Sequence, residues 1–315
     1  MWENLIVSLN AVVPMFLIIG LGYFVRSRKM VDEPELRKFN NVAFRIFLPC
    51  QLFKNVFDSD LERSFNLKLV VFTVLCILLV YLLALVSVLL TEKLPQRRGV
   101  MIQAIFRSNF ILLGIPLVSS IYGAENLGAA PVMIAIVVPL FNVLAVITLE
   151  VFHSSKVRVG QVLLDIVKNP LIISSLLGLG AKLLGLPLYS SAIFSTTLGS
   201  LSQVATPLML FILGGSFQFS SVRSNGRRIL FCALGKLIVV PAIAFSLGAA
   251  IGLRGSDLAV LLGVFASPPA ANSYTMAQQM GGDADLAANL VVIGTAASCF
   301  TMFCWILLLK QTGLV

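Results

Sequence analysis

The chain has 315 residues, of which 58% are hydrophobic and 12% are charged, and its mean hydropathy is +0.97. A soluble domain carries about a quarter charged residues to cover its surface, so this composition excludes soluble enzyme folds and predicts a membrane protein. The net charge of +9 does not indicate nucleic-acid binding, because the basic residues are not clustered on a water-facing domain.

Ten candidate membrane spans follow one another along the chain. A bilayer core of about 30 Å requires roughly 20 apolar residues in a helix, and a window of that length locates them. The first span runs directly into Arg26, without the small-residue cleavage site of a signal peptide, so we expect it to be retained. In order, the predicted spans are Leu5 to Val25, Phe39 to Phe57, Leu67 to Leu90, Val100 to Ile121, Ala129 to Phe152, Asn169 to Leu188, Ser195 to Phe217, Ile229 to Leu253, Leu258 to Met280 and Leu286 to Leu309.

The distribution of Lys and Arg between the loops predicts the orientation. Cytoplasmic loops retain positive charge, and one set of alternate loops holds fourteen basic residues while the other set and the C-terminus hold six. Both termini should therefore lie outside the cytoplasm, in an inner or plasma membrane that the chain crosses many times. The fourteen are Arg26, Arg28, Lys29, Arg37, Lys38, Lys93, Arg97, Arg98, Lys156, Arg158, Lys168, Arg223, Arg227 and Arg228.

The two halves of the chain resemble each other. Pro49-x-x-Leu52-Phe53 in span two recurs as Pro207-x-x-Leu210-Phe211 in span seven, and ordered identities also align span four with nine and span five with ten. Five spans per half is an odd number, so the second half must enter the membrane from the opposite side. We therefore predict an all-α membrane protein with two inverted five-helix repeats, residues 1–155 and 156–315, as in secondary transporters.

Spans four and nine carry helix-breaking residues at matching places. Gly and Pro weaken helices, and a broken helix frees backbone groups that a substrate can satisfy near the midplane. One such site would be a kink made for packing, as we expect at Pro14, Pro139 and Pro241. Two symmetric sites that also contain Asn or Ser favour a substrate site where the broken helices cross. The candidate residues are Asn109, Gly114, Pro116, Pro268, Pro269, Asn272 and Ser273.

Ionisable residues inside spans are candidates for function because their burial in a membrane is costly. Arg107, one turn before the expected break, could attract an anion, while Arg45 and Lys236 could do the same or could snorkel or cap a helix. No Asp or Glu falls at a midplane, which excludes the titratable carboxylate of a sodium/proton antiporter and favours an anion as substrate. The cysteines have no metal-site spacing and His153 stands alone, so we expect no metal, no cofactor and no enzyme activity.

Several strings are similar to the auxin efflux carrier family, which joins the plant PIN auxin exporters to bacterial malonate or dicarboxylate permeases. The matching strings are Asn109-x4-Gly114-Ile115-Pro116-Leu117, Asn169-Pro170-x3-Ser174-Ser175-Leu176-x-Gly178-Leu179, Leu201-Ser202 with Phe211-x-Leu213-Gly214, and Pro268 with Ala277. The resemblance implies a fold like that of NhaA and the bile-acid transporters, with helices four and nine crossing at Pro116 and Pro268. It also implies that Asn109 helps to bind a carboxylate and that helices three to five and eight to ten move against a scaffold of helices one, two, six and seven. In relatives that scaffold forms a homodimer.

The sequence therefore predicts an elevator-type transporter of small organic anions, which exports or exchanges them or acts as a uniporter. A symporter that couples the carboxylate to sodium or protons remains an alternative, because unwound segments can bind sodium through carbonyl groups. A membrane receptor that binds the anion without moving it is a further alternative. The expected partners are the anion and the lipid bilayer.

Overall fold

A computed structural model describes residues 2–59, 66–122, 129–153, 164 and 166–315. These residues form helices and no strand, which confirms the predicted all-α fold. Five helical stretches among them are long and apolar enough to cross a membrane. They are α4 (Leu67–Thr91), Val132–His153 within α7 (Ala130–His153), α10 (Ala192–Ser216), the stretch Phe219–Ala250 and α15 (Ala284–Gln311).

Among the other predicted spans, the first is the continuous helix α1 (Trp2–Ser27), and the rest are made of shorter or interrupted helices. The stretch Phe219–Ala250 itself contains α11 (Phe219–Leu234), the wide turn η5 (Gly235–Val239) and α12 (Val240–Ala250). The remaining elements are α2 (Glu33–Val42), η1 (Ala43–Phe47), α3 (Leu48–Phe57), α5 (Pro95–Phe106), η2 (Phe110–Gly114), α6 (Ile115–Tyr122), α9 (Pro170–Leu183), the short turn η4 (Leu188–Ser190), α13 (Ser256–Ala266) and α14 (Asn272–Gln279).

Two spans are broken, and they are the two in which we predicted interruptions. Residues 107–109 separate α5 from η2, and residues 267–271 separate α13 from α14. The first break lies earlier than expected, because Arg107 is the C-cap of α5 and Pro116 lies in the first turn of α6. Proline is tolerated there, since the first turn of a helix needs few N–H donors.

Three of the spans contain a π-helical turn just before a proline. After each of η1, η2 and η5, the N–H of the next residue donates a hydrogen bond to the carbonyl five residues earlier. A proline follows that residue directly in all three cases, namely Pro49, Pro116 and Pro241. Because proline has no N–H, a regular helix would leave a carbonyl unpaired and would clash with the ring. The wider turn lets the chain continue past the proline, so Pro241, which we expected to be a simple kink, follows a π-helical turn.

Glycines allow two pairs of helices to approach closely. α1 packs along α10, where a Cβ on Gly214 would lie 1.9 Å from the Ile19 carbonyl oxygen and one on Gly22 would lie 2.0 Å from that of Phe211. α3 packs along α9, where a Cβ on Gly178 would lie 2.7 Å from the Phe53 carbonyl oxygen. Small residues bring membrane helices together in this way.

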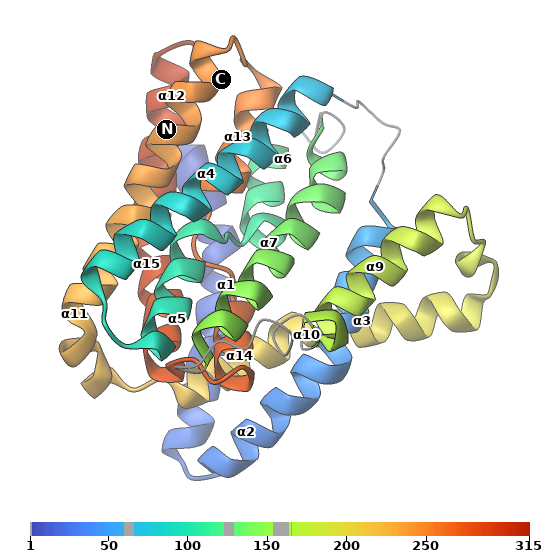
Figure 1. Cartoon of the computed structure of the whole chain (residues 1–315), viewed down its shortest axis with the longest axis vertical. Coiled ribbons are helices and arrows are strands. Elements are labelled where there is room, and N and C mark those ends of the chain that lie inside the picture. The colour runs from blue at the N-terminus through green and yellow to red at the C-terminus, as the bar shows by residue number, and fades with distance from the viewer. Residues whose placement is uncertain (1, 60–65, 123–128, 154–163, 165) are drawn as a thin grey trace.

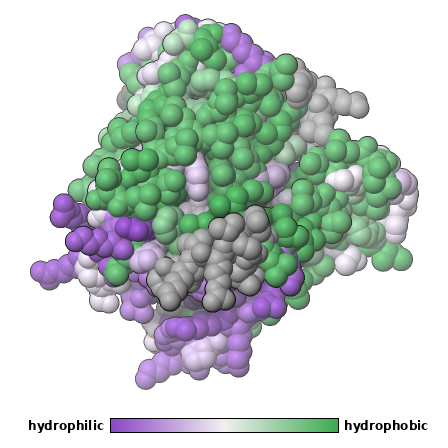
Figure 2. All heavy atoms as spheres, in the orientation of Figure 1, coloured by the Kyte–Doolittle hydropathy of each residue, from purple (hydrophilic) through white to green (hydrophobic). Residues whose placement is uncertain are grey.

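The two ends of the molecule differ in character. Both termini lie near the same end, whereas α2, the turn from α4 to α5 and the start of α11 lie at the other (Figure 1). Together with the first turn of α5, those segments hold eight of the fourteen basic residues counted above, namely Arg37, Lys38, Lys93, Arg97, Arg98, Arg223, Arg227 and Arg228. We call this the basic end. Figure 2 shows hydrophilic residues gathered there and apolar residues over the middle of the visible face. Lys156 and Arg158 lie outside the described residues.

Candidate functional site

The two broken helices meet at their breaks. The Asn109 N–H donates a hydrogen bond of 2.8 Å to the Pro268 carbonyl, which joins the first half of the chain to the second through main-chain atoms. Nearby, a Cβ on Gly114 would lie 2.5 Å from the Gly263 carbonyl oxygen, so the two helices pass backbone to backbone. The predicted proximity of the two interrupted segments is thus present in the geometry.

An open cavity lies beside this crossing, and its empty space of about 550 Å³ includes open solvent. Its walls come from α3, the break after α5, η2, α7, α10 and the start of α14, and its apolar part includes Leu52, Phe110 and Phe141. Among the residues that the structure describes, none that lines the cavity is acidic. The polar lining residues are Gln51, Asn55, Arg107, Ser108, Asn109, Asn142, Thr206 and Asn272.

Arg107 is the charged group of this cavity, and it is 3% exposed. Its Nη2 donates to the Asn142 Oδ1 at 2.5 Å and its Nη1 to the Met276 sulfur at 2.7 Å. Within the described residues no ion pair joins Arg107 to a carboxylate. A buried cation without a counter-charge is unfavourable, so an anion in the cavity would complete the site.

Several polar atoms around the crossing have no hydrogen-bond partner in the protein. They are the Ser108 Oγ, the Asn109 Nδ2 and the Asn272 Oδ1, all inaccessible at the atom level. Buried polar groups are nearly always paired, so unpaired atoms at a cavity mark places for water or a ligand. Ser108 and the Asn109 amide can donate, which suits a carboxylate oxygen.

The predicted site residues divide into two groups. Arg107, Asn109 and Asn272 line the cavity. The others do not line it and are placed around the crossing. Gly114 lies at the close approach to Gly263, the Pro268 carbonyl accepts from the Asn109 N–H, and Pro269 packs against Gly294 of α15. The Ser273 carbonyl accepts a hydrogen bond from the Gln103 Nε2, and Pro116 is exposed on α6.

Five polar residues in the cavity wall were not predicted from the sequence: Gln51, Asn55, Ser108, Asn142 and Thr206. Asn142 orients Arg107, and the Gln51 Nε2 donates to the Thr206 Oγ1 at 2.8 Å, with Asn55 one turn along α3. A signal was present, since Asn142 follows Pro139 and the pair Gln51 and Thr206 adjoins the repeated prolines. Polar side chains beside a proline in an apolar span are worth counting as candidates.

The cavity is closed toward the basic end. There α14 packs against α2, with the Asn40 Nδ2 donating to the Thr275 carbonyl at 3.3 Å and the Asn41 Nδ2 to the Gln279 Oε1 at 3.2 Å. Asn40 and Thr275 are fully buried, whereas Gln51 and Asn55 on the other side are partly exposed. Gln51 and Asn55 thus belong to the partly exposed portion of the cavity wall.

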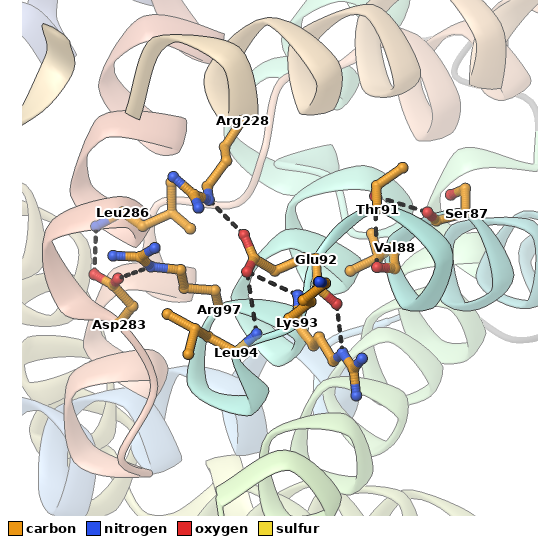
Figure 3. A network of polar contacts seen from close by, with 11 residues as sticks. Ser87, Val88, Thr91, Glu92, Lys93, Leu94, Arg97, Arg228, Asp283 and Leu286 are labelled. Carbon is orange, nitrogen blue, oxygen red and sulfur yellow. Dashed lines mark hydrogen bonds and ion pairs between the residues drawn. The ribbon is translucent and has the colours of Figure 1, made fainter. Parts of the chain in front are cut away.

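A polar network at the basic end ties four helices together (Figure 3). Glu92, at the end of α4, accepts hydrogen bonds from Arg228 of α11 and from the Lys93 and Leu94 N–H groups. The Arg97 Nε of α5 donates to Asp283 at 2.9 Å, and Asp283 caps α15. Burial acts to raise the pKa of Glu92, but the Arg228 and backbone hydrogen bonds outweigh it and leave this pKa below its ordinary value.

No group of three or more His, Cys, Asp or Glu side chains that could hold a metal ion is present in the part of the chain that the structure describes.

Comparisons with known proteins agree with this architecture. A family model described as membrane transport protein matches residues 7–159 and 152–306. The chain is 26% identical over 308 residues to an uncharacterized transporter of Methanocaldococcus jannaschii, covering 95% of this chain and 98% of that one. It is 24% identical over 303 residues to an uncharacterized transporter of Methanothermobacter thermautotrophicus, covering 95% and 97%.

Proposed function

Because the chain belongs to the membrane transport protein family, which confirms the resemblance to the auxin efflux carriers, we propose that it carries a small organic anion across the membrane. The substrate class is a carboxylate, such as malonate or an auxin-like weak acid, bound at the crossing of the two broken helices. The observation that carries the proposal is Arg107, a buried cation at a cavity without an acidic lining residue.

The unpaired atoms support the same assignment. A carboxylate has two acceptor oxygens, and the guanidinium, the Ser108 hydroxyl and the Asn109 amide supply donors on one side of the cavity. Leu52, Phe110 and Phe141 form an apolar wall for the rest of the molecule. Such a mixture of apolar lining and few polar groups is typical of small-molecule sites.

Transport in this proposal proceeds by alternating access. The ten predicted spans form two inverted repeats, and α4–α7 with α11–α15 move as one unit against α1–α3, α9 and α10 in an elevator-like motion. The network around Glu92 and Asp283 joins helices of the moving unit only, and the α2–α14 contacts cross its boundary. Opening toward the basic end would separate α14 from α2. The termini are extracytoplasmic and a homodimer forms through the scaffold helices.

The direction and driving force are part of the proposal. Uniport or efflux follows from the lack of a midplane carboxylate, since an inside-negative potential favours anion exit by about 2.3 kcal/mol per charge per 100 mV. Proton exchange does not require a carboxylate, because a buried amine can also bind and release a proton.

Flux measurements in liposomes test the function. The purified protein is reconstituted and screened with malonate, other dicarboxylates and aromatic monocarboxylates, with and without sodium and a pH gradient. Arg107→Met and Asn109→Ala should abolish or strongly reduce flux, whereas Arg45→Met, which changes an exposed cation outside the cavity, should not.

Four outcomes separate the alternatives. Flux that Arg107→Met abolishes and Arg45→Met preserves would support the site. Binding of an anion without flux would favour the receptor, and a strict requirement for sodium would favour the sodium symporter. Equal flux in wild type and Arg107→Met would refute the assignment of the site.

A further inference from the structure

Lys236 is the second cation buried in the predicted membrane core. Its side chain is 0% exposed and its Nζ has no hydrogen-bond partner among the described residues. It stands in η5, the π-helical turn before Pro241. Lys236 and Arg107 are the buried basic residues of the described spans, and neither forms an ion pair with a carboxylate there; unlike Arg107, Lys236 does not line the cavity.

The turn that carries Lys236 packs directly behind the crossing. Gly235 directly precedes Lys236, and a Cβ on it would lie 3.5 Å from the side chain of Ile105. Ile105 is two residues before Arg107 in the chain. On the other side the Trp305 Nε1 donates to the Leu237 carbonyl at 2.9 Å. η5 also contacts α13, so it touches both half-helices that end at the breaks.

Few charged or titratable groups surround this lysine. The elements that pack on η5 are α5, α11, α12, α13 and α15, and α12 has no titratable side chain. On the others, the carboxylates lie in the first turns of α13 and α15, far from η5 along those helices, and only thiols and Arg107 lie at middle depth. The full set is Arg97, Arg98 and Arg107 of α5 and its cap, Arg223, Arg227, Arg228 and Cys232 of α11, Asp257 of α13, and Asp285, Cys299, Cys304 and Lys310 of α15.

A lone ammonium ion in such a place is not stable. Removing a charge from water without a partner is strongly unfavourable, so a buried lysine either gives up its proton or gains a negative neighbour. In this chain the negative neighbour is missing from the described protein and arrives only with the anion. The turn that carries Lys236 packs on the end of α5, two residues before Arg107, so in a low-dielectric interior an anion beside Arg107 favours the protonated amine.

We propose that Lys236 is a proton-binding site whose proton travels with the anion. The neutral amine takes a proton from water on the loading side to become an ammonium ion, and returns it to water on the release side, with no bond made to the substrate. This inference rests on the proposed anion transport. It replaces uniport by proton-coupled symport, in which an inward proton gradient drives uptake.

The test uses liposomes with the membrane potential clamped to zero and the carboxylate that gives the largest flux in the screen above. For one proton per anion, an inward gradient of one pH unit should accumulate the anion about tenfold, after subtraction of protein-free liposomes. Lys236→Met should still exchange the anion but should lose this accumulation. Lys310→Met, an exposed lysine at the end of α15, should behave as wild type.

Lys236→Arg distinguishes a proton site from a structural cation. Arginine keeps its charge at all accessible pH values, so it can replace a structural cation but cannot release a proton. Loss of accumulation in both Lys236→Met and Lys236→Arg supports the proposal, and retention in either variant overturns it. Lys236→Gln replaces Lys236→Met if thermal melting shows that the latter does not fold.

Measurements on the wild-type protein also distinguish a failure of the proton site from a failure of the proposed function. Anion flux that ignores the pH gradient overturns the proton site and leaves the proposed function in place. Absence of flux and of binding for every carboxylate removes both.

Discussion

Replacing Gly214 by alanine should weaken the packing of α1 against α10 by a measurable amount. The added Cβ would lie 1.9 Å from the Ile19 carbonyl oxygen, and real Cβ atoms stay at least 3.0 Å from such atoms. The two backbones must therefore separate by about 1 Å over a seam that also contains Gly22. Overpacking of this kind costs about 1–3 kcal/mol.

Gly199→Ala is the matched control, because Gly199 belongs to the same helix and its Cβ would meet nothing within 4 Å. At an open helical position alanine is more favourable than glycine by roughly 0.5–1 kcal/mol. The two substitutions are chemically identical, yet we expect opposite signs and a difference of about 2–4 kcal/mol.

Thermal unfolding of the purified protein in detergent measures this difference. At about 2–4 °C per kcal/mol, Gly214→Ala should melt on the order of 5–10 °C below Gly199→Ala. Equal melting temperatures, or a more stable Gly214→Ala, would refute the close approach of α1 and α10.

Three further predictions concern the site and the basic end. Asn142→Leu removes a hydrogen-bond acceptor from the Arg107 guanidinium. A hydrogen bond to a charged group is worth about 1.5–3 kcal/mol, so the affinity for the anion should change by about tenfold or more in a binding assay. An affinity equal to that of the wild type would refute the contact. The pKa of Glu92 is lowered in the fold, so its contribution to stability should be complete above about pH 4.3 and disappear as the pH falls through the lowered value; an unfolding series against pH should show this loss in wild type and not in Glu92→Gln. Asn41→Leu removes the bond to Gln279, so a cysteine introduced into the cavity of a cysteine-free variant should react faster with a thiol reagent added at the basic end, and an unchanged rate would contradict a closure at α2 and α14.

The helical fold and the two broken spans were predictable because they depend on local chemistry. Continuous apolar stretches have few alternatives in a membrane, and the pair Pro268 and Pro269 cannot stay inside a regular helix. The position of the first break was not predictable from Pro116. A π-helical turn accommodates that proline, so the chain opens instead at Arg107.

The composition of the cavity was only partly predictable. Arg107, Asn109 and Asn272 adjoin the breaks, and their sequence neighbours identify them. Asn142 and Thr206 come from long, mostly apolar helices whose polar side chains do not gather on one face, so no hydrophobic face indicates which way these two side chains point. Such residues are found once the packing of the helices is known.

The bond between the Asn109 N–H and the Pro268 carbonyl has a consequence for how this protein diverges. Both partners are main-chain atoms, so among the standard residues proline alone at position 109 would remove the donor. Side chains around the crossing can be substituted while this main-chain hydrogen bond is kept. New substrates can thus arise by substitution at the walls of the cavity, with the joint between the two halves inherited unchanged.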